Sequence, residues 1–260
     1  TATLAWGVNL PAHTVIIKGT EIYNAKKGSF VDVGMLDVMQ IFGRAGRPQY
    51  EKEGEAMIIT SQEKLPKYLK LLTNALPIES QFIDKLPDHL NAEIILGTVS
   101  NTREAVSWLS YTYLYTRMLR NPMKYGITYN MLNKDPLLID FRTQLIHNAA
   151  NILMEAKMIK YDLSSGNFFS TDPGRVASHY YIVHESMSEY QKKFFKQGNK
   201  SISDIQLFNI ISESKEFENI KVRDEELNEL EKLARKYCPI KITHAVASSL
   251  GKANILLQTY

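Results

Sequence analysis

The stretch Gln40-Ile-Phe-Gly-Arg-Ala-Gly-Arg47, followed by Pro48, decides how the first part of this 260-residue chain is interpreted. Read at 3.6 residues per turn, Gln40, Arg44 and Arg47 stand at i, i+4 and i+7, which predicts one shared helical face. Pro48 predicts the end of that helix. The apolar side chains on its other side are Val38, Ile41, Phe42 and Ala45.

Two guanidinium groups one to two turns apart suit a polyphosphate ligand. Each arginine offers a planar fork of donors that stays charged, and Gly43 and Gly46 allow a ligand to approach the backbone closely. A bare pair of arginines is more often a solvated surface feature, so the pattern needs support from its neighbours. That support comes from the residues upstream.

The upstream stretch is Thr1-Ala-Thr-Leu-Ala-Trp-Gly-Val-Asn-Leu-Pro-Ala12, and the apolar run Thr14 to Ile17 follows it. Together with Gln40 to Arg47 it resembles motifs V and VI of the superfamily 2 DExH-box helicases of the superkiller-like branch. The resemblance extends from Thr1 to Tyr260 and is strongest to the first cassette of the two-cassette members. Further stretches that carry it are Gly28–Asp32, Leu36–Gln40, Pro77–Gln81, Gly251-Lys252 and Asn254–Tyr260.

The resemblance implies roles for individual residues. Thr1 and Thr3 match residues whose hydroxyl groups contact the phosphates of the tracking strand. Such contacts bind the nucleic-acid backbone without reading its sequence. Gln40, Arg44 and Arg47 match the catalytic motif VI, whose arginines approach the β- and γ-phosphates of ATP. The residues expected on the nucleotide side are Gly7, Asn9, Gly43, Arg44 and Arg47.

Between the two motifs, Lys18–Tyr23 and Ser29–Val33 are short extended segments around the turn Asn24–Gly28. This pattern predicts a β-hairpin, with a plain connecting loop as the alternative. In the family that the chain resembles, a hairpin at this place parts the duplex. The side chains then expected to contact nucleic acid are Tyr23, Lys26, Lys27 and Phe30.

The first part of the chain alternates strands with helices. We expect a buried parallel strand over Thr14 to Ile17, a second buried strand over Glu55 to Thr60, and a helix over Pro66 to Leu72 with Leu65, Leu69 and Leu72 aligned. We interpret this as the closing half of a RecA-like α/β domain whose opening strands lie upstream.

Beyond Leu76 the pattern becomes helical. Asn101 and Glu104 predict a capping box for one helix reaching Arg120, and Pro136 predicts a second helix over Leu137 to Met158. A hairpin over Met158–Tyr161 and Asn167–Ser170 then completes a winged-helix pattern. Arg142, Gln144 and His147 could read bases from the last helix; we prefer a structural spacer, because dispersed polar faces are usually solvated.

The last part predicts a helical bundle. Thr171 can cap a helix containing His179-Tyr-Tyr181, and Lys192 to Ser203 is the candidate linker. Helices are expected from Ser203 and from Asp224. The fold class is therefore mixed α/β and α. The expected domains are 1–75, the C-terminal part of a second RecA-like domain; 76–183, a winged helix with a β wing; and 184–260, the start of a helical ratchet-type domain.

Composition excludes several classes. Hydrophobic content of 44% and charged content of 23% are ordinary for a globular protein, and a formal charge of +3 does not by itself indicate nucleic-acid binding. The single cysteine, Cys238, excludes an internal disulfide, and the scattered histidines give no reason to expect a metal site. No apolar run approaches the ~20 residues of a membrane span, so no membrane is expected.

The sequence contains neither a G-x-x-x-x-G-K-[ST] phosphate loop nor a D-E-x-H segment. We expect ATP and Mg²⁺ to bind mainly to an upstream RecA lobe, and residues 1–260 alone to be inactive. The resemblance implies a fragment of an ATP-dependent 3′–5′ helicase of nuclear or cytoplasmic location. Its expected partners are RNA or DNA, the upstream lobe and the subunits of a large complex. The alternatives are a non-catalytic scaffold cassette and, last, a winged-helix transcription factor.

Overall fold

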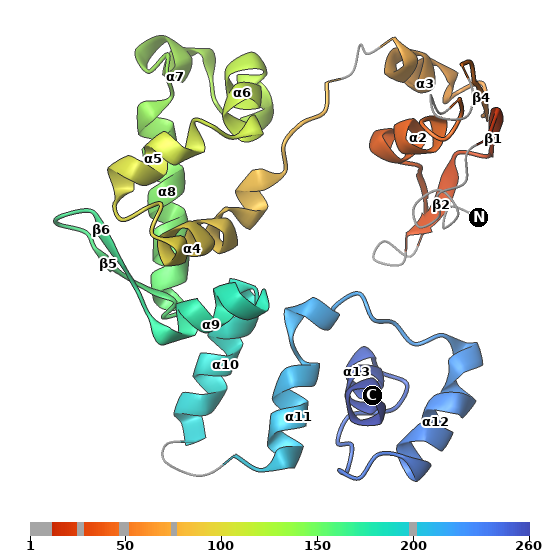
Figure 1. Ribbon diagram of the computed structural model, residues 1–260, viewed down its shortest axis with the longest axis vertical. Coiled ribbons are helices and arrows are strands. Elements are labelled where there is room, and N and C mark those ends of the chain that lie inside the picture. The colour runs from red at the N-terminus through yellow and green to blue at the C-terminus, as the bar shows by residue number, and fades with distance from the viewer. Residues whose placement is uncertain (1–11, 25–28, 47–51, 74–76, 198–201) are drawn as a thin grey trace. The chain divides into compact units, whose positions relative to one another are not determined.

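The computed structural model describes residues 12–24, 29–46, 52–73, 77–197 and 202–260 (Figure 1). The chain divides into two compact units, Thr1–Ile78 and Glu79–Tyr260. Each unit is described by itself below.

The first unit is built on two parallel strands. β1 (Thr14–Lys18) pairs with β4 (Glu55–Ile59), with Ile17 opposite Ile58. The connection between them contains a hairpin of β2 (Glu21–Asn24) and β3 (Ser29–Asp32), and then helix α2 (Met35–Phe42). Helix α3 (Leu65–Leu72) follows β4. The predicted strands, their parallel pairing and the hairpin are confirmed, and the plain loop is excluded. The predicted burial of the two strands is wrong: only Ile17 is buried, whereas Ile16, Met57 and Ile59 are at least half exposed, because few side chains of this small unit cover them.

The core of the first unit is small. Its buried side chains are Ile17, Val33, Val38 and Tyr68. The predicted leucine stripe of α3 is largely uncovered in the chain, since Leu65, Leu69 and Leu72 are 41–51% exposed. Tyr68, beside that stripe, supplies the buried contact of the helix instead, and its hydroxyl donates to the carbonyl of Thr20 at 3.5 Å.

The second unit begins with a helical module and a two-stranded wing (Figure 1). Its central helix is α8 (Ile139–Glu155), whose buried residues include Ile146, Ala150 and Leu153. Wing strands β5 (Ile159–Asp162) and β6 (Asn167–Ser170) pair antiparallel, which confirms the predicted second hairpin. The other helices of this module are α4 (Leu86–Leu96), α5 (Thr102–Leu109), α6 (Tyr113–Arg120) and α7 (Tyr129–Lys134), with short 3₁₀ turns at Phe82–Lys85 and Pro122–Tyr125.

Two predicted helices differ from the structure. The single helix to Arg120 is wrong: it is divided into α5 and α6, because the chain turns after Leu109 and the Thr112 side chain caps α6 through the amide of Tyr115. The helix predicted from Leu137 begins at Ile139, where the Asp135 carboxylate accepts hydrogen bonds from the amides of Ile139 and Asp140 at 2.8 and 2.7 Å. The Asn101 cap of α5 is confirmed, although Glu104 reaches back to Ser100 rather than to Asn101.

A carboxylate fixes the start of the second unit. Glu79 accepts two hydrogen bonds from Arg117, at 2.8 and 3.1 Å, and further ones from Asn121 and Tyr125. The guanidinium of Arg117 is the main cause that lowers the pKa of Glu79 to about 2. This cluster ties the first residues of the unit to α6 and to the turn after it.

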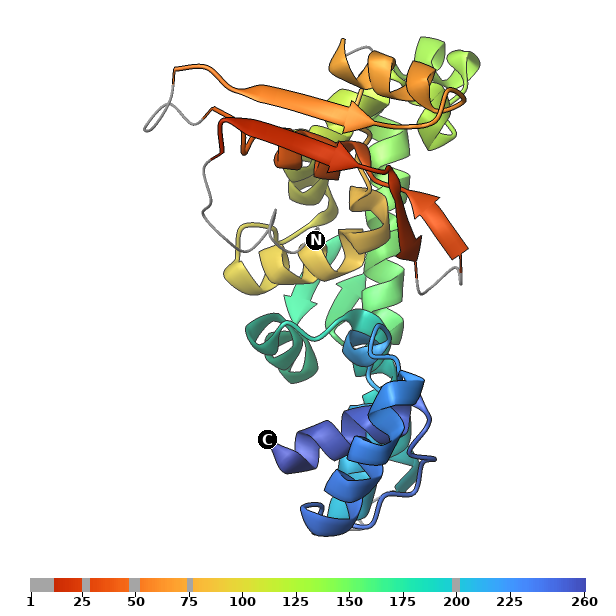
Figure 2. The same cartoon turned by 90° about the vertical axis from the view of Figure 1, so that its right-hand side faces the viewer.

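The remaining helices follow the wing. They are α9 (Asp172–Tyr180), α10 (His184–Gln197), α11 (Asp204–Ser212), α12 (Leu227–Lys236) and α13 (Ser249–Thr259), with 3₁₀ turns at Lys215–Phe217 and Asp224–Glu226. Figure 2 shows α11, α12 and α13 gathered at the C-terminal end of this unit. Ser203 and Gln206 form the capping box of α11. The predicted linker from Lys192 is wrong as far as Gln197, because α10 continues through it.

Carboxylates from two places in the sequence hold the start of α10. The amide of His184 donates to Asp88 of α4, and the amide of Val183 donates to Glu216, both at 2.8 Å. Ser186 also donates to Glu216 at 2.6 Å. These bonds connect α10 both to the helical module and to the C-terminal helices. No helix in the described ranges has the length and apolar character that a bilayer span requires.

Candidate functional site

The segment of the second predicted motif lies at the end of α2. Val38 anchors this helix in the core, whereas Gln40 is exposed on its last turn. The helix ends at Phe42. The amides of Arg44 and Ala45 donate to the carbonyls of Ile41 and Phe42, at 3.1 and 3.0 Å. Arg44 therefore lies on a tight turn after the helix, and the predicted helical face shared by Gln40 and Arg44 is wrong.

This turn is joined to the end of the first predicted motif by backbone contacts. The amide of Ala12 donates to the carbonyl of Arg44 at 3.2 Å, and the amide of Gly46 donates to the carbonyl of Ala12 at 3.0 Å. Ala12 and Ala45 thus form a parallel bridge. The bridge uses the backbone of Ala45 for pairing with Ala12, which is consistent with α2 ending at Phe42.

Two glycines let this turn sit against the start of β4. Gly46 has a φ of 62°, and a Cβ added to it would lie 2.6 Å from the amide nitrogen of Gly54. A Cβ on Gly54 would lie 2.3 Å from the amide nitrogen of Gly46. Both positions therefore require glycine. Sequence reasoning did not select Gly54, because a glycine before a strand carries no distinctive pattern.

The hairpin presents the two predicted aromatic side chains. Tyr23 of β2 lies opposite Phe30 of β3, and their rings meet edge to face with centroids 5.7 Å apart. They are 60% and 69% exposed. An exposed aromatic pair of this kind offers ring faces to a nucleic-acid base.

Helix α3 and the turn before it fix the base of the hairpin. Glu21 and Asp32, a cross-strand pair, face two lysines: Lys64 contacts both carboxylates, and Lys67 lies 2.7 Å from Asp32. Hydrogen bonds from Lys64 and then Lys67 lower the pKa of Asp32 to about 2. The same contacts raise the pKa of Lys64. Sequence reasoning missed these residues, because the partners are more than 30 positions apart.

A groove of about 650 Å³ runs along this base. It lies where β1 and β4 end, and Thr20 and Thr60 exchange a hydrogen bond of 3.0 Å between their hydroxyls there. Lys18, Phe30 and Lys64 also line it. The groove combines a ring, hydroxyl groups and ammonium groups.

The structure brings together part of the predicted site. Gln40, Gly43 and Arg44 lie at the end of α2, and Tyr23 and Phe30 pair on the hairpin. The other predicted site residues lie outside the described residues: Thr1, Thr3, Gly7, Asn9, Lys26, Lys27 and Arg47.

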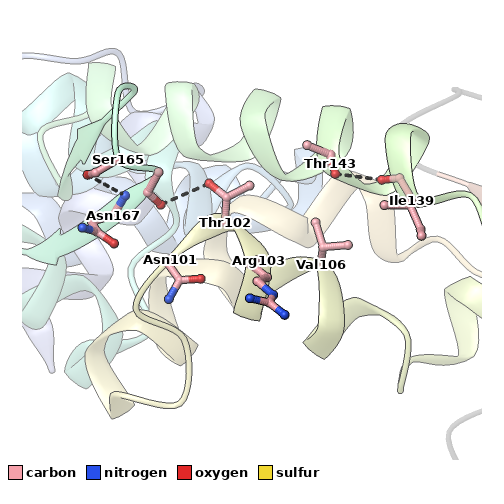
Figure 3. Close-up of a pocket in the computed structure, with 9 residues that line it drawn as sticks. Asn101, Thr102, Arg103, Val106, Ile139, Thr143, Ser165 and Asn167 are labelled. Atoms are coloured by element: carbon pink, nitrogen blue, oxygen red, sulfur yellow. Dashed lines mark hydrogen bonds between the residues drawn. The ribbon is translucent and has the colours of Figure 1, made fainter.

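The second unit contains a pocket of about 590 Å³ between the N-terminus of α5, α8 and the turn of the wing (Figure 3). Thr102 donates to the carbonyl of Gly166 at 3.1 Å and so attaches the wing to α5. Arg142 is not available to read bases. It is 6% exposed, donates to the carbonyls of Val106, Leu137 and Leu138, and stacks on Tyr115.

Asp88, His184 and Glu185 are the one group in the described residues with metal-ligand chemistry. The Nδ1 atom of His184 lies 3.1 Å from Asp88 and 3.4 Å from Glu185. The hydrogen bond to Asp88 raises the pKa of His184, which favours a proton on this imidazole. The group therefore acts as a hydrogen-bonded cap of α10.

Comparison with known proteins decides the family. Residues 79–155 match a family described as a winged helix-turn-helix domain, and residues 170–260 match the Sec63 Brl domain. Over all 260 residues the chain is 54% identical to the DExH-box ATP-dependent RNA helicase DExH14 of Arabidopsis thaliana and 55% identical to activating signal cointegrator 1 complex subunit 3 of Homo sapiens. It is 54% identical to the U5 small nuclear ribonucleoprotein 200 kDa helicase of Drosophila melanogaster.

Over its whole length the chain resembles DExH-box helicases of the superkiller-like branch. It covers 12% of the length of each of these three relatives. The predicted winged helix is confirmed, and the C-terminal helices of this DExH-box chain belong to the Sec63 Brl family.

Proposed function

We propose that this chain is part of an ATP-dependent helicase that moves 3′ to 5′ along one strand of nucleic acid. The observation that carries the proposal is the 54–55% sequence identity to the three relatives named above, over an alignment that includes all 260 residues. One of these relatives is named an ATP-dependent RNA helicase. In this proposal, residues 1–75 are the C-terminal part of the second RecA-like domain.

On the nucleotide side, Arg44 and Arg47 would approach ATP and Mg²⁺ held by the other RecA lobe. Their guanidinium groups would stabilise the charge that develops on the transferring phosphoryl group. Gln40, Gly43, Gly7 and Asn9 would line the same side. The backbone bridge between Ala12 and the Arg44 turn supports this arrangement, because it ties the two motifs together.

On the strand side, Thr1 and Thr3 would contact phosphates, and the hairpin with Tyr23, Lys26, Lys27 and Phe30 would part the duplex. RNA is the preferred substrate, because one close relative is named an RNA helicase and another a ribonucleoprotein helicase. By the same reasoning, the protein would act with other subunits of a large nuclear or cytoplasmic complex.

The test is steady-state ATP hydrolysis by the full-length protein with single-stranded RNA. Arg44→Ala should lower kcat by on the order of 10³-fold, as loss of an arginine finger does, and should change strand binding little. Arg44→Lys should restore only part of the rate, because an ammonium group lacks the planar fork. Arg235→Ala is the matched control, since Arg235 is 82% exposed on α12.

A rate for Arg44→Ala close to that of the parent would contradict the assignment of Arg44. If the parent itself bound RNA but did not hydrolyse ATP, the alternative of a non-catalytic scaffold cassette would replace the proposal.

A further inference from the structure

Tyr181 has a left-handed backbone conformation, which is unfavourable for a residue with a bulky side chain. It follows α9 with a φ of 58°, in the left-handed region, where glycine is the usual residue. The next amide, of Ile182, donates to the carbonyl of Ala177 at 2.9 Å, and Ile182 packs against the core. This helix ending is a motif that glycine would form without strain.

Two other non-glycine residues in the described ranges have a positive φ, and both differ from Tyr181. Leu138 has a φ of 52° and is completely buried, so its core contacts offset the strain. Lys157 has a φ of 56° and is exposed, and its side chain carries no aromatic ring. Tyr181 differs from both, because it combines strain with an aromatic ring that is 89% exposed. Strain of this kind is retained more often at functional positions than elsewhere.

The surroundings of Tyr181 indicate what the ring could contact. It lines a groove of about 550 Å³ together with Leu96, Arg175, His179 and Tyr180. We call these five residues the α9 patch. Tyr180 is 68% exposed, and the His179 ring meets it edge to face at 4.7 Å. The patch therefore presents two ring faces beside cationic or hydrogen-bonding groups.

Charge in the α9 patch is modest. Arg175 lies 2.7 Å from the carboxylate of Asp172, which offsets part of its charge. Binding to this surface would thus depend on the rings more than on phosphate neutralisation. Aromatic platforms for single strands work in this way, since every base has a face that can stack.

We propose that the α9 patch is a stacking site for the bases of single-stranded nucleic acid, separate from the motif V, motif VI and hairpin contacts. Tyr181 and Tyr180 stack on bases, and Arg175 and His179 lie near the adjoining phosphates. The inference does not depend on the assignment of Arg44, because it concerns strand contact by the second unit alone.

The experiment uses the 260-residue chain and a 10-nucleotide oligouridylate that contains one 4-thiouridine. After irradiation and digestion with trypsin, the cross-linked peptides are identified by mass spectrometry. We expect a cross-link at Tyr180 or Tyr181 on the peptide from Val176 to Lys192, which also contains Tyr190. Anisotropy with the same oligonucleotide, and with an abasic oligonucleotide of equal length, measures affinity.

Tyr181→Ala should remove the cross-link and weaken oligouridylate binding about 5-fold or more, whereas Tyr181→Phe should retain both. Tyr181→Gly should also lose the cross-link while its thermal unfolding midpoint stays equal or rises, which separates the ring from the fold. Tyr111→Ala is the matched control, because Tyr111 is 87% exposed elsewhere in the same unit.

Three results would overturn the inference. The first is equal binding of the abasic oligonucleotide, which would mean that charge alone acts. The second is unchanged oligouridylate binding by Tyr181→Ala and Tyr181→Gly, the result expected if the patch contacts a protein. The third is a fall in the unfolding midpoint of Tyr181→Gly, which would mean that the ring serves the fold. Loss of ATP hydrolysis in Arg44 variants would leave all these readouts unaffected.

Discussion

At the scale of single residues, the contacts that shape the candidate site are made by backbone and by small side chains. Ala12, Arg44 and Gly46 join the two motifs through their amides and carbonyls. Gly46 and Gly54 allow that turn to approach β4. Arg44 was predicted as a candidate from its charge and spacing, but its position on a turn depends on the pairing with Ala12. That pairing lies 32 positions away and has no signature in the sequence.

Gly54→Ala tests the close approach of the turn to β4. A Cβ at 2.3 Å from a backbone nitrogen cannot be accommodated without a shift, so the variant should lose about 1–3 kcal/mol of stability by overpacking. In the full-length protein it should also lower ATP hydrolysis, because the turn that carries Arg44 must move. Chemical denaturation and kcat are the measurements.

Gly97→Ala is the control for this prediction. A Cβ at Gly97 meets no atom within 4 Å, so the variant changes backbone preference without a clash. An unaltered kcat for Gly54→Ala together with unaltered stability would show that the turn and β4 are not packed as described.

At the scale of elements, the two hairpins could be predicted well and the helix ends less well. The aromatic and β-branched residues of Ser29–Asp32 favour a strand, and the residues before them favour a turn. The structure has this strand, paired with β2. Thr102–Arg120 is divided into two helices by a turn after Leu109. The apolar periodicity of this stretch continues through the turn and therefore does not reveal it. Of the lysines that hold the hairpin base, Lys67 lies in α3 and Lys64 in the turn before it, and neither was predictable from the hairpin sequence.

The ion pairs at the hairpin base predict a pH dependence. Asp32 has a pKa of about 2 in the folded chain, below the ~3.9 of an unfolded aspartate. Its contribution to stability is therefore complete above about pH 4 and disappears as the pH falls towards 2. The difference in unfolding midpoint between the parent and Asp32→Asn should be present at pH 6, shrink below pH 4 and vanish near pH 2.

High salt should reduce the same difference at pH 6, because the pairs are partly exposed. Glu231→Gln is the control, since its surface pair with Arg235 is 3.5 Å long and exposed. A pH-independent difference between the parent and Asp32→Asn would mean that Asp32 acts through packing and not through its charge.

The aromatic pair on the hairpin predicts that unwinding and hydrolysis can be separated. Base–aromatic stacking is worth ~1–3 kcal/mol per base, comparable to one DNA stacking step of ~1.4 kcal/mol. In the full-length protein, Phe30→Ala and Tyr23→Ala should therefore slow duplex unwinding while ATP hydrolysis and single-strand binding remain near normal.

Phe169→Ala on the wing hairpin is the matched aromatic control, because Phe169 is 54% exposed. Equal losses of hydrolysis and unwinding in the hairpin variants would assign the hairpin to the nucleotide site or to the fold. Unchanged unwinding would leave it without a role in strand separation.

At the scale of the whole molecule, the chain consists of two compact units with different roles in the proposal. The first unit carries the hairpin and the segments proposed as motifs V and VI, and the second carries the regions that match the winged helix-turn-helix and Sec63 Brl domains. Glu79 is the first residue of the second unit. Its carboxylate accepts hydrogen bonds from Arg117, Asn121 and Tyr125, which hold the start of this unit against α6 and the turn after it.

The central claim is that these residues work in a helicase that moves 3′ to 5′. The most direct measurement is strand displacement by the full-length protein on two RNA duplexes of identical sequence, one with a 3′ single-stranded tail and one with a 5′ tail. The account predicts ATP-dependent displacement of the 3′-tailed duplex, little displacement of the 5′-tailed one, and loss of both with Arg44→Ala. Displacement that needs no ATP, or that prefers the 5′ tail, would contradict it.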